Sequence, residues 1–153
     1  MAGKHFPKGL DGRQRDQDGE IRQKRGDTLV KTLRNGGLVG LLCDRDLVGN
    51  GIEVEFFGEM TTFPPGPATL ALRTGATLIT AAVFSGPGIN HHAIISGPID
   101  TTRSGSLRAD VARITQEIAR HFEDYIRRAP EQWHMFQPNW PSDREAELAR
   151  RAR

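Results

Sequence analysis

Apolar side chains fall along this chain in patterns that predict both strands and helices. Residues 38–43 and 77–84 are continuous runs of apolar or β-branched residues, which are typical of strands covered on both faces. Between them, residues 52–57 alternate apolar with acidic side chains, as a strand with one exposed face does. A shorter strand is expected at residues 92–96, where a Gly-Pro pair ends it.

Helices are expected between and after these strands. Residues 107–128 carry apolar side chains at spacings of three and four, which predicts a long amphipathic helix. Shorter helices are expected at residues 27–33, with Asp27 as the cap, and from Pro67 to a terminating Gly75. An aromatic, proline-bound arm then leads to a short polar helix that a capping box at residues 142–145 opens. Strands alternating with helices predict an α/β fold with a mixed, mainly parallel sheet flanked by helices.

Composition divides the 153 residues into three parts. Residues 1–26 are charged and poor in apolar side chains, so we expect them to be disordered. Residues 27–143 form the expected α/β domain, and residues 144–153 a basic C-terminal helix or tail. A single cysteine excludes a disulfide framework, and no run reaches the roughly 20 apolar residues of a membrane-spanning helix. Membrane contact is therefore expected to be peripheral, and the terminal arginines to be solvated rather than to bind nucleic acid.

Charged residues follow two of the expected strands, where open sheets tend to place ligands. Asp44, Arg45 and Asp46 come directly after the first apolar run. Two carboxylates beside an arginine can tune a general base or bind a metal, and the same trio equally fits a structural ion pair with a turn-capping aspartate. Glu55 and Glu59 flank an aromatic pair. A partly desolvated carboxylate there would have a raised pKa useful for proton transfer, whereas exposed strand carboxylates are the commoner case.

Three further residues are candidates for ligand contacts. Gly66 precedes the first proline of an expected helix, so the free amides there fit an anion such as a phosphate, and Arg73 lies on the same helix. This signal is generic, because every helix has an N-terminus. His134 is a candidate acid or ligand, although such residues are more often packed, hydrogen-bonded histidines. The adjacent His91 and His92 face opposite ways on a strand, so we expect no metal site, and no cofactor is expected.

Several motifs, in a fixed order, resemble those of one known family. They are Asp44-Arg45-Asp46, then Gly51-Ile52-Glu53-Val54-Glu55-Phe56-Phe57-Gly58-Glu59, then Pro65-Gly66-Pro67-Ala68-Thr69-Leu70-Ala71, Thr74-Gly75-Ala76 and Trp133-His134-Met135-Phe136-Gln137-Pro138-Asn139-Trp140. Over roughly residues 27–143 the chain resembles the bacterial lipid A lauroyl/myristoyl acyltransferases, and within them the actinobacterial phosphatidylinositol mannoside acyltransferases. The resemblance implies a glycerolipid-acyltransferase-like fold.

The resemblance also implies a reaction, a place and roles for residues. The reaction is transfer of a fatty acyl group from acyl-CoA to a sugar hydroxyl of a membrane glycolipid, at the cytoplasmic face of the inner membrane. In that family a histidine of an H-x4-D/E motif deprotonates the hydroxyl, and an acidic partner orients the imidazole. Carried over, Glu55 or Glu59 is the expected supporting acid, without preference between them. The residues expected to contact the substrates are Asp44, Arg45, Asp46, Gly66, Arg73 and His134.

The histidines depart from the family's pattern. None of the five has an acidic residue five positions further on, so the H-x4-D/E motif is absent from this chain. We therefore expect the family's N-terminal part, with the catalytic histidine, to be missing, and the isolated chain to be inactive. The alternative interpretation is a catalytically inactive truncated fragment or a module that binds lipid or acyl-CoA.

Overall fold

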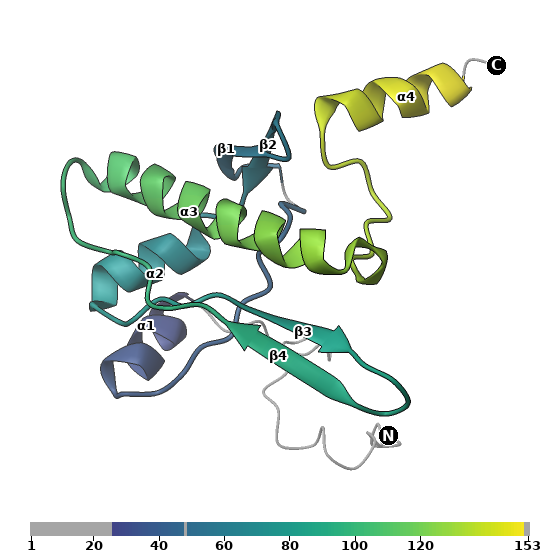
Figure 1. Ribbon diagram of the computed structural model, residues 1–153. Coiled ribbons are helices and arrows are strands. Elements are labelled where there is room, and N and C mark those ends of the chain that lie inside the picture. Colours follow the sequence, from purple (N-terminus) through teal and green to yellow (C-terminus); the bar gives the residue numbers. More distant parts are fainter. Residues whose placement is uncertain (1–25, 48, 152–153) are drawn as a thin grey trace, which may run out of the picture.

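The structure is a computed structural model that describes residues 26–47 and 49–151 (Figure 1). The expected disorder of the charged N-terminal segment concerns residues outside this range, apart from Gly26. The helices and strands are α1 (Gly26–Arg34), β1 (Ile52–Phe56), β2 (Glu59–Phe63), α2 (Gly66–Thr74), β3 (Ala81–Ser85), β4 (His91–Ile95), α3 (Leu107–Arg128), the short 3-10 helix η1 (Pro130–Gln132) and α4 (Pro141–Arg151).

The strands form two separate antiparallel hairpins. β1 pairs with β2, with Phe56 opposite Glu59, and β3 pairs with β4, with Ala81 opposite Ile95. The mixture of helices and strands was predicted correctly, but the mainly parallel sheet was wrong for the described residues. Antiparallel neighbours need only a short turn between them, whereas parallel strands must find each other across a long connection. Each of these pairs is joined by such a turn.

Residues 38–43, predicted as a central strand, are extended chain without a strand partner. In the described part of the molecule, none of their backbone groups bonds to another backbone segment. Leu38 is 86% and Leu42 100% exposed, while Cys43 is buried. Of the second predicted strand, residues 77–84, only the last part pairs as β3. A run of apolar side chains is typical of a strand that other elements bury on both faces. To form a strand, however, the segment must also pair with a neighbouring strand, and the run does not supply one.

Helix α3 lies between the β1–β2 hairpin and α2 (Figure 1). It begins at Leu107, as predicted, and the hydroxyl of the preceding Ser106 accepts a hydrogen bond from the Ala109 amide. One part of its apolar face packs with Ala68 of α2 and with Ile99. The next part, around Ala119, packs with the β1–β2 hairpin. The side chains that this hairpin buries are Val54, Phe56 and Phe63. α3 thus packs against α2 along one part of its apolar face and against the β1–β2 hairpin along the next.

The shorter helices begin and end close to where the sequence predicts. α2 ends at Gly75, whose φ of +71° is the left-handed cap that glycine favours. α4 begins at Pro141 rather than at the predicted cap Ser142, because the Asp143 carboxylate accepts hydrogen bonds from the amides of Asn139 and Trp140. α4 buries none of its residues, and Figure 1 shows it standing away from α3.

Candidate functional site

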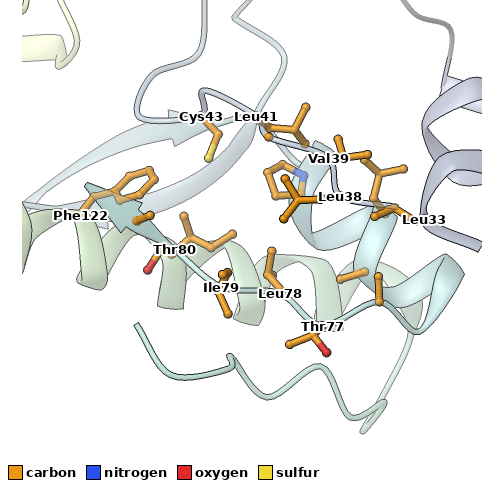
Figure 2. Close-up of a pocket in the computed structure, with 17 residues that line it drawn as sticks. Leu33, Leu38, Val39, Leu41, Cys43, Thr77, Leu78, Ile79, Thr80 and Phe122 are labelled. Carbon is orange, nitrogen blue, oxygen red and sulfur yellow. The ribbon is translucent and has the colours of Figure 1, made fainter. Parts of the chain in front are cut away.

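An apolar pocket lies between α2, α3 and the two extended segments, residues 38–43 and 77–81 (Figure 2). Its volume is about 320 Å³. Figure 2 shows the two segments on opposite sides of the pocket. Ala71 of α2 and Ile118 and Phe122 of α3 also line it. The pocket has the dry, apolar lining that suits a hydrocarbon chain.

Cys43 contributes its thiol to this lining. Burial, and secondly the neighbouring Asp44 carboxylate, raise the pKa of Cys43 to about 11. The thiol is therefore protonated at neutral pH. It acts as an apolar part of the pocket wall rather than as a nucleophile.

A polar cluster lies beside the pocket, where Thr80 contacts α3. Its buried hydroxyl Oγ1 is 2.8 Å from His121 Nδ1 and 3.0 Å from Tyr125 Oη. His121 Nε2 in turn lies 3.7 Å from Glu117 Oε1. With the imidazole proton on Nε2, Nδ1 accepts a hydrogen bond from the threonine hydroxyl, and Glu117 lies near Nε2 but beyond hydrogen-bond distance. The cluster holds the segment before β3 against α3.

The sequence predictions missed this histidine. The H-x4-D/E motif has its acid five residues after the histidine, whereas Glu117 precedes His121 by four. Residues four apart on a helix lie on the same face. An acid four positions before a histidine in the predicted long helix was the signal that could have found the pair.

Asp46 organises the turn before β1. Its Oδ1 accepts a hydrogen bond from the Gly49 amide at 3.0 Å. Its Oδ2 accepts from the Gly51 amide at 2.6 Å and from the Thr62 hydroxyl at 3.0 Å. A carboxylate that accepts these bonds is a turn-capping residue, so the geometry favours the structural alternative for Asp46.

Asp44 and Arg45 lie next to this turn but have different surroundings. Asp44 Oδ2 accepts a hydrogen bond from the Trp133 indole at 3.1 Å, which ties the aromatic arm to the loop. Arg45 is half-buried, and its guanidinium forms no ion pair within the described residues. The ion pair, which was one alternative for the trio, is therefore not formed by Arg45 among the described residues.

The two glutamates of the EFFGE motif differ in how far they are engaged. The carboxylate of Glu59 accepts two hydrogen bonds from Ser142, from its amide at 3.0 Å and its hydroxyl at 2.7 Å. Glu59 thus anchors the first turn of α4. The Gln116 side chain bonds to the backbone of Glu55 instead. The Glu55 N–H donates to Gln116 Oε1 at 2.9 Å, and the Glu55 carbonyl accepts from Gln116 Nε2 at 2.8 Å. Its carboxylate is exposed and has no partner among the described residues.

The remaining candidates lie apart from the apolar pocket. Gly66 and Arg73 line a groove of about 800 Å³ between α1 and α2, together with Lys31 and Arg34. Within the described ranges, no carboxylate pairs with these three cations. His134 is exposed, and its ring stacks on Phe136 with 6.1 Å between the ring centroids. The structure thus gathers Gly66 and Arg73, but not His134, into one groove.

In the part of the chain that the structure describes, no three His, Cys, Asp or Glu side chains lie close enough together to hold a metal ion. No helix there is both long and apolar enough to cross a bilayer.

Comparison with known proteins finds similarity over most of the chain. The family model of the bacterial lipid A biosynthesis acyltransferases matches residues 9–142. A phosphatidylinositol mannoside acyltransferase of Mycobacterium tuberculosis (strain CDC 1551 / Oshkosh) is 44% identical over 118 residues, which are 76% of this chain and 35% of the relative. One of Mycolicibacterium smegmatis is 40% identical over 128 residues, 83% of this chain and 39% of the relative. The chain thus spans little more than a third of the length of these relatives.

Proposed function

Because this chain belongs to the bacterial lipid A biosynthesis acyltransferase family, as its motifs predicted, we propose that it contributes to an enzyme that transfers a fatty acyl group to a membrane glycolipid. The proposed donor is acyl-CoA, and the proposed acceptor is a sugar hydroxyl of a phosphatidylinositol mannoside. The observation that carries this proposal is the 44% identity over 118 residues to a protein of that name. A membrane-lipid acceptor also supports peripheral action at the cytoplasmic face of the inner membrane.

The apolar pocket is the proposed place for part of the acyl chain. Its walls include Ala71, Ile118 and Phe122, and the protonated thiol of Cys43 keeps the lining uncharged. Each methylene group that leaves water for such a lining contributes about 0.8 kcal/mol. A pocket that binds the chain of the donor therefore also holds its thioester at a defined place.

Glu55 is the proposed acid that supports the catalytic histidine. Its carboxylate is exposed and unengaged within the described residues, whereas the carboxylate of Glu59 is already bonded to Ser142. The Gln116 side chain fixes the backbone of Glu55 at both its N–H and its C=O, so the strand directs the side chain. None of the histidines in the described part forms a hydrogen bond or ion pair with Glu55. The imidazole that Glu55 orients is proposed to come from the part of the enzyme that this chain does not match.

The groove between α1 and α2 is proposed to hold phosphate groups of the substrates. Lys31, Arg34 and Arg73 give it positive charge, and no described carboxylate neutralises them. Both acyl-CoA and a phosphatidylinositol mannoside carry phosphate, which such cations bind. Arg45, Asp44, Asp46 and His134 remain predicted substrate contacts.

A chimeric enzyme tests the proposed reaction. The 118 matching residues of the M. tuberculosis relative are replaced by those of this chain, and transfer of labelled palmitate from palmitoyl-CoA to a phosphatidylinositol mannoside is measured. We expect the chimera to transfer the label and the isolated chain not to. A folded chimera without activity would contradict the proposal.

The role of Glu55 is tested in the same chimera. Glu55→Gln is expected to lower kcat by about 100-fold, since it removes the charge that supports the imidazolium. Glu53→Gln is the matched control, because Glu53 is also exposed and lies on the same face of β1. Equal activity of the two variants would remove Glu55 from the mechanism.

A further inference from the structure

Two apolar segments on opposite sides of the pocket present large side chains to solvent. On one side, Leu38 and Leu42 of residues 38–43 are 86% and 100% exposed. On the other side, Ile79 is 44% and Val83 69% exposed. Continuous apolar runs of this kind are normally covered on both faces of a sheet. Here, within the described residues, the cover is absent from the outer face of each segment.

The backbone of both segments is open as well. Residues 38–43 have no backbone hydrogen bond to any described segment. At the two ends of this hairpin, the Thr80 carbonyl accepts a hydrogen bond from the Ser96 amide, and the Gly86 amide donates one to the Asn90 carbonyl. The even-numbered residues of β3 therefore direct their backbone N–H and C=O groups towards β4. The N–H and C=O groups of Ala81 and Val83 therefore point outward, where no described residue bonds them. Those of Ser85 are taken by a side-chain amide.

We propose that residues 38–43 and the outer edge of β3 bind an extended polypeptide strand from the part of the enzyme that this chain does not match. Open N–H and C=O groups at a strand edge can pair with the backbone of an added strand, whereas a lipid chain has no such groups to offer. The exposed leucine, isoleucine and valine side chains then pack on the residues of the added strand. The M. tuberculosis relative has ample chain to provide it, because the matched residues are only 35% of its length.

The surface suits a strand of another sequence better than a second copy of this chain. Pairing two copies through β3 alone would leave residues 38–43 still without backbone partners. A single strand lying across the open side of the pocket would have both segments as neighbours and would cover Leu42 and Ile79 together. It also closes the open side of the apolar pocket, which both segments line. The inference rests on the unpaired edges and on the length of the relatives, and it does not depend on which acyl group is transferred.

The probe is the longest continuous segment of the M. tuberculosis relative outside the matched 118 residues, produced separately and mixed with the full chain. We expect a one-to-one complex in analytical ultracentrifugation. Hydrogen exchange of the amides of residues 38–43, Ala81 and Val83 is expected to slow at least about tenfold in the complex. Absence of a complex, or protection confined to other elements, would overturn the proposal.

A charge at the proposed interface provides the sharper test. Leu42→Asp is expected to weaken the complex at least about tenfold, because it buries an unpaired carboxylate. Leu42 is fully exposed in the chain alone, so the variant should keep the melting temperature of the unsubstituted chain. Leu148→Asp is the matched control, since Leu148 is 67% exposed on α4, and it should bind normally. Equal binding of the two variants, or a homodimer that Leu42→Asp dissociates, would refute the assignment of this strand.

Discussion

Phe57 has a backbone conformation that favours asparagine or glycine over a large aromatic residue. Its φ is +55° and that of Gly58 is +81°, and the two residues connect β1 to β2 as a two-residue turn. Two positive φ angles are characteristic of the type I′ turn, for which Asn-Gly is the preferred pair. A side chain other than glycine in the left-handed region costs about 1–2 kcal/mol. Something must therefore offset this cost at Phe57.

The contacts of the ring supply the offset. The centroid of the Phe57 ring lies 4.7 Å from that of Phe56 and 6.4 Å from that of Trp140, and the Arg127 guanidinium carbon lies 5.1 Å from it. Each aromatic pair contributes about 0.5–1.5 kcal/mol and an exposed cation–π contact about 0.5–1 kcal/mol. Partial burial of the side chain, which is 38% exposed, adds about 1 kcal/mol. Removal of the ring should therefore cost about 3 kcal/mol.

Two substitutions separate the strain from the contacts. Phe57→Ala removes the ring and keeps an unfavourable left-handed residue, so the free energy of unfolding should fall by about 3 kcal/mol. Phe57→Asn removes the same contacts but relieves about 1 kcal/mol of strain. Its free energy of unfolding should therefore fall by only about 2 kcal/mol.

The assay is urea unfolding followed by circular dichroism, with the same two substitutions at Phe136 as controls. Phe136 is 87% exposed, so both of its variants should stay within about 0.5 kcal/mol of the unsubstituted chain. Alanine is the more apolar of the two replacements, so contacts without strain would make Phe57→Ala the more stable variant. The reasoning is therefore refuted if Phe57→Asn is no more stable than Phe57→Ala.

Three further predictions concern the pocket wall and the turn before β1. Because burial raises the pKa of Cys43 from 9.0 to about 11, the folded chain should react with a thiol reagent at neutral pH far more slowly than the urea-unfolded chain, and equal rates would contradict this. The raised pKa also contributes stability that is complete below about pH 9 and is lost as the pH rises towards 11; Cys43→Ala should remove this part of the pH dependence in urea titrations. Gly51→Ala should lower the free energy of unfolding by about 2 kcal/mol, because a Cβ there would lie 2.4 Å from the Phe63 carbonyl oxygen and 2.8 Å from Asp46 Oδ2. Gly40→Ala, whose Cβ would meet no atom within 4 Å, should leave the melting temperature unchanged, and equal melting temperatures of the two variants would contradict the argument.

The helices were predictable because their determinants are close together in the sequence. The long helix α3 follows from apolar spacings of three and four, and its bounds, Leu107–Arg128, agree with the prediction. The left-handed Gly75 likewise marks the end of α2 in the sequence itself. Family membership was also readable from the sequence, because it depends on the order of several motifs rather than on any contact between them.

Strand pairing was not predictable in the same way. The apolar runs at residues 38–43 and 77–84 were predicted as buried strands, but only residues 81–85 form one. The pattern within a run does not indicate which other segment it pairs with. The structure pairs each strand with the one that follows it, and leaves residues 38–43 without a backbone partner in the described part. A parallel sheet was expected because α/β alternation usually produces one. Short connections here favoured hairpins instead.

Contacts between distant parts of the chain determine which candidate side chains already have a hydrogen-bond partner. The sequence identified Glu55 and Glu59 as equal candidates, and the bond of Glu59 to Ser142, 83 residues away, distinguishes them. Thr80 and His121 are 41 residues apart and meet only because α3 packs beside the segment before β3. Residue type and local spacing thus determine which groups are available for chemistry. Which of them remain unengaged depends on tertiary packing, since a hydrogen bond between remote residues leaves no periodic trace in the sequence.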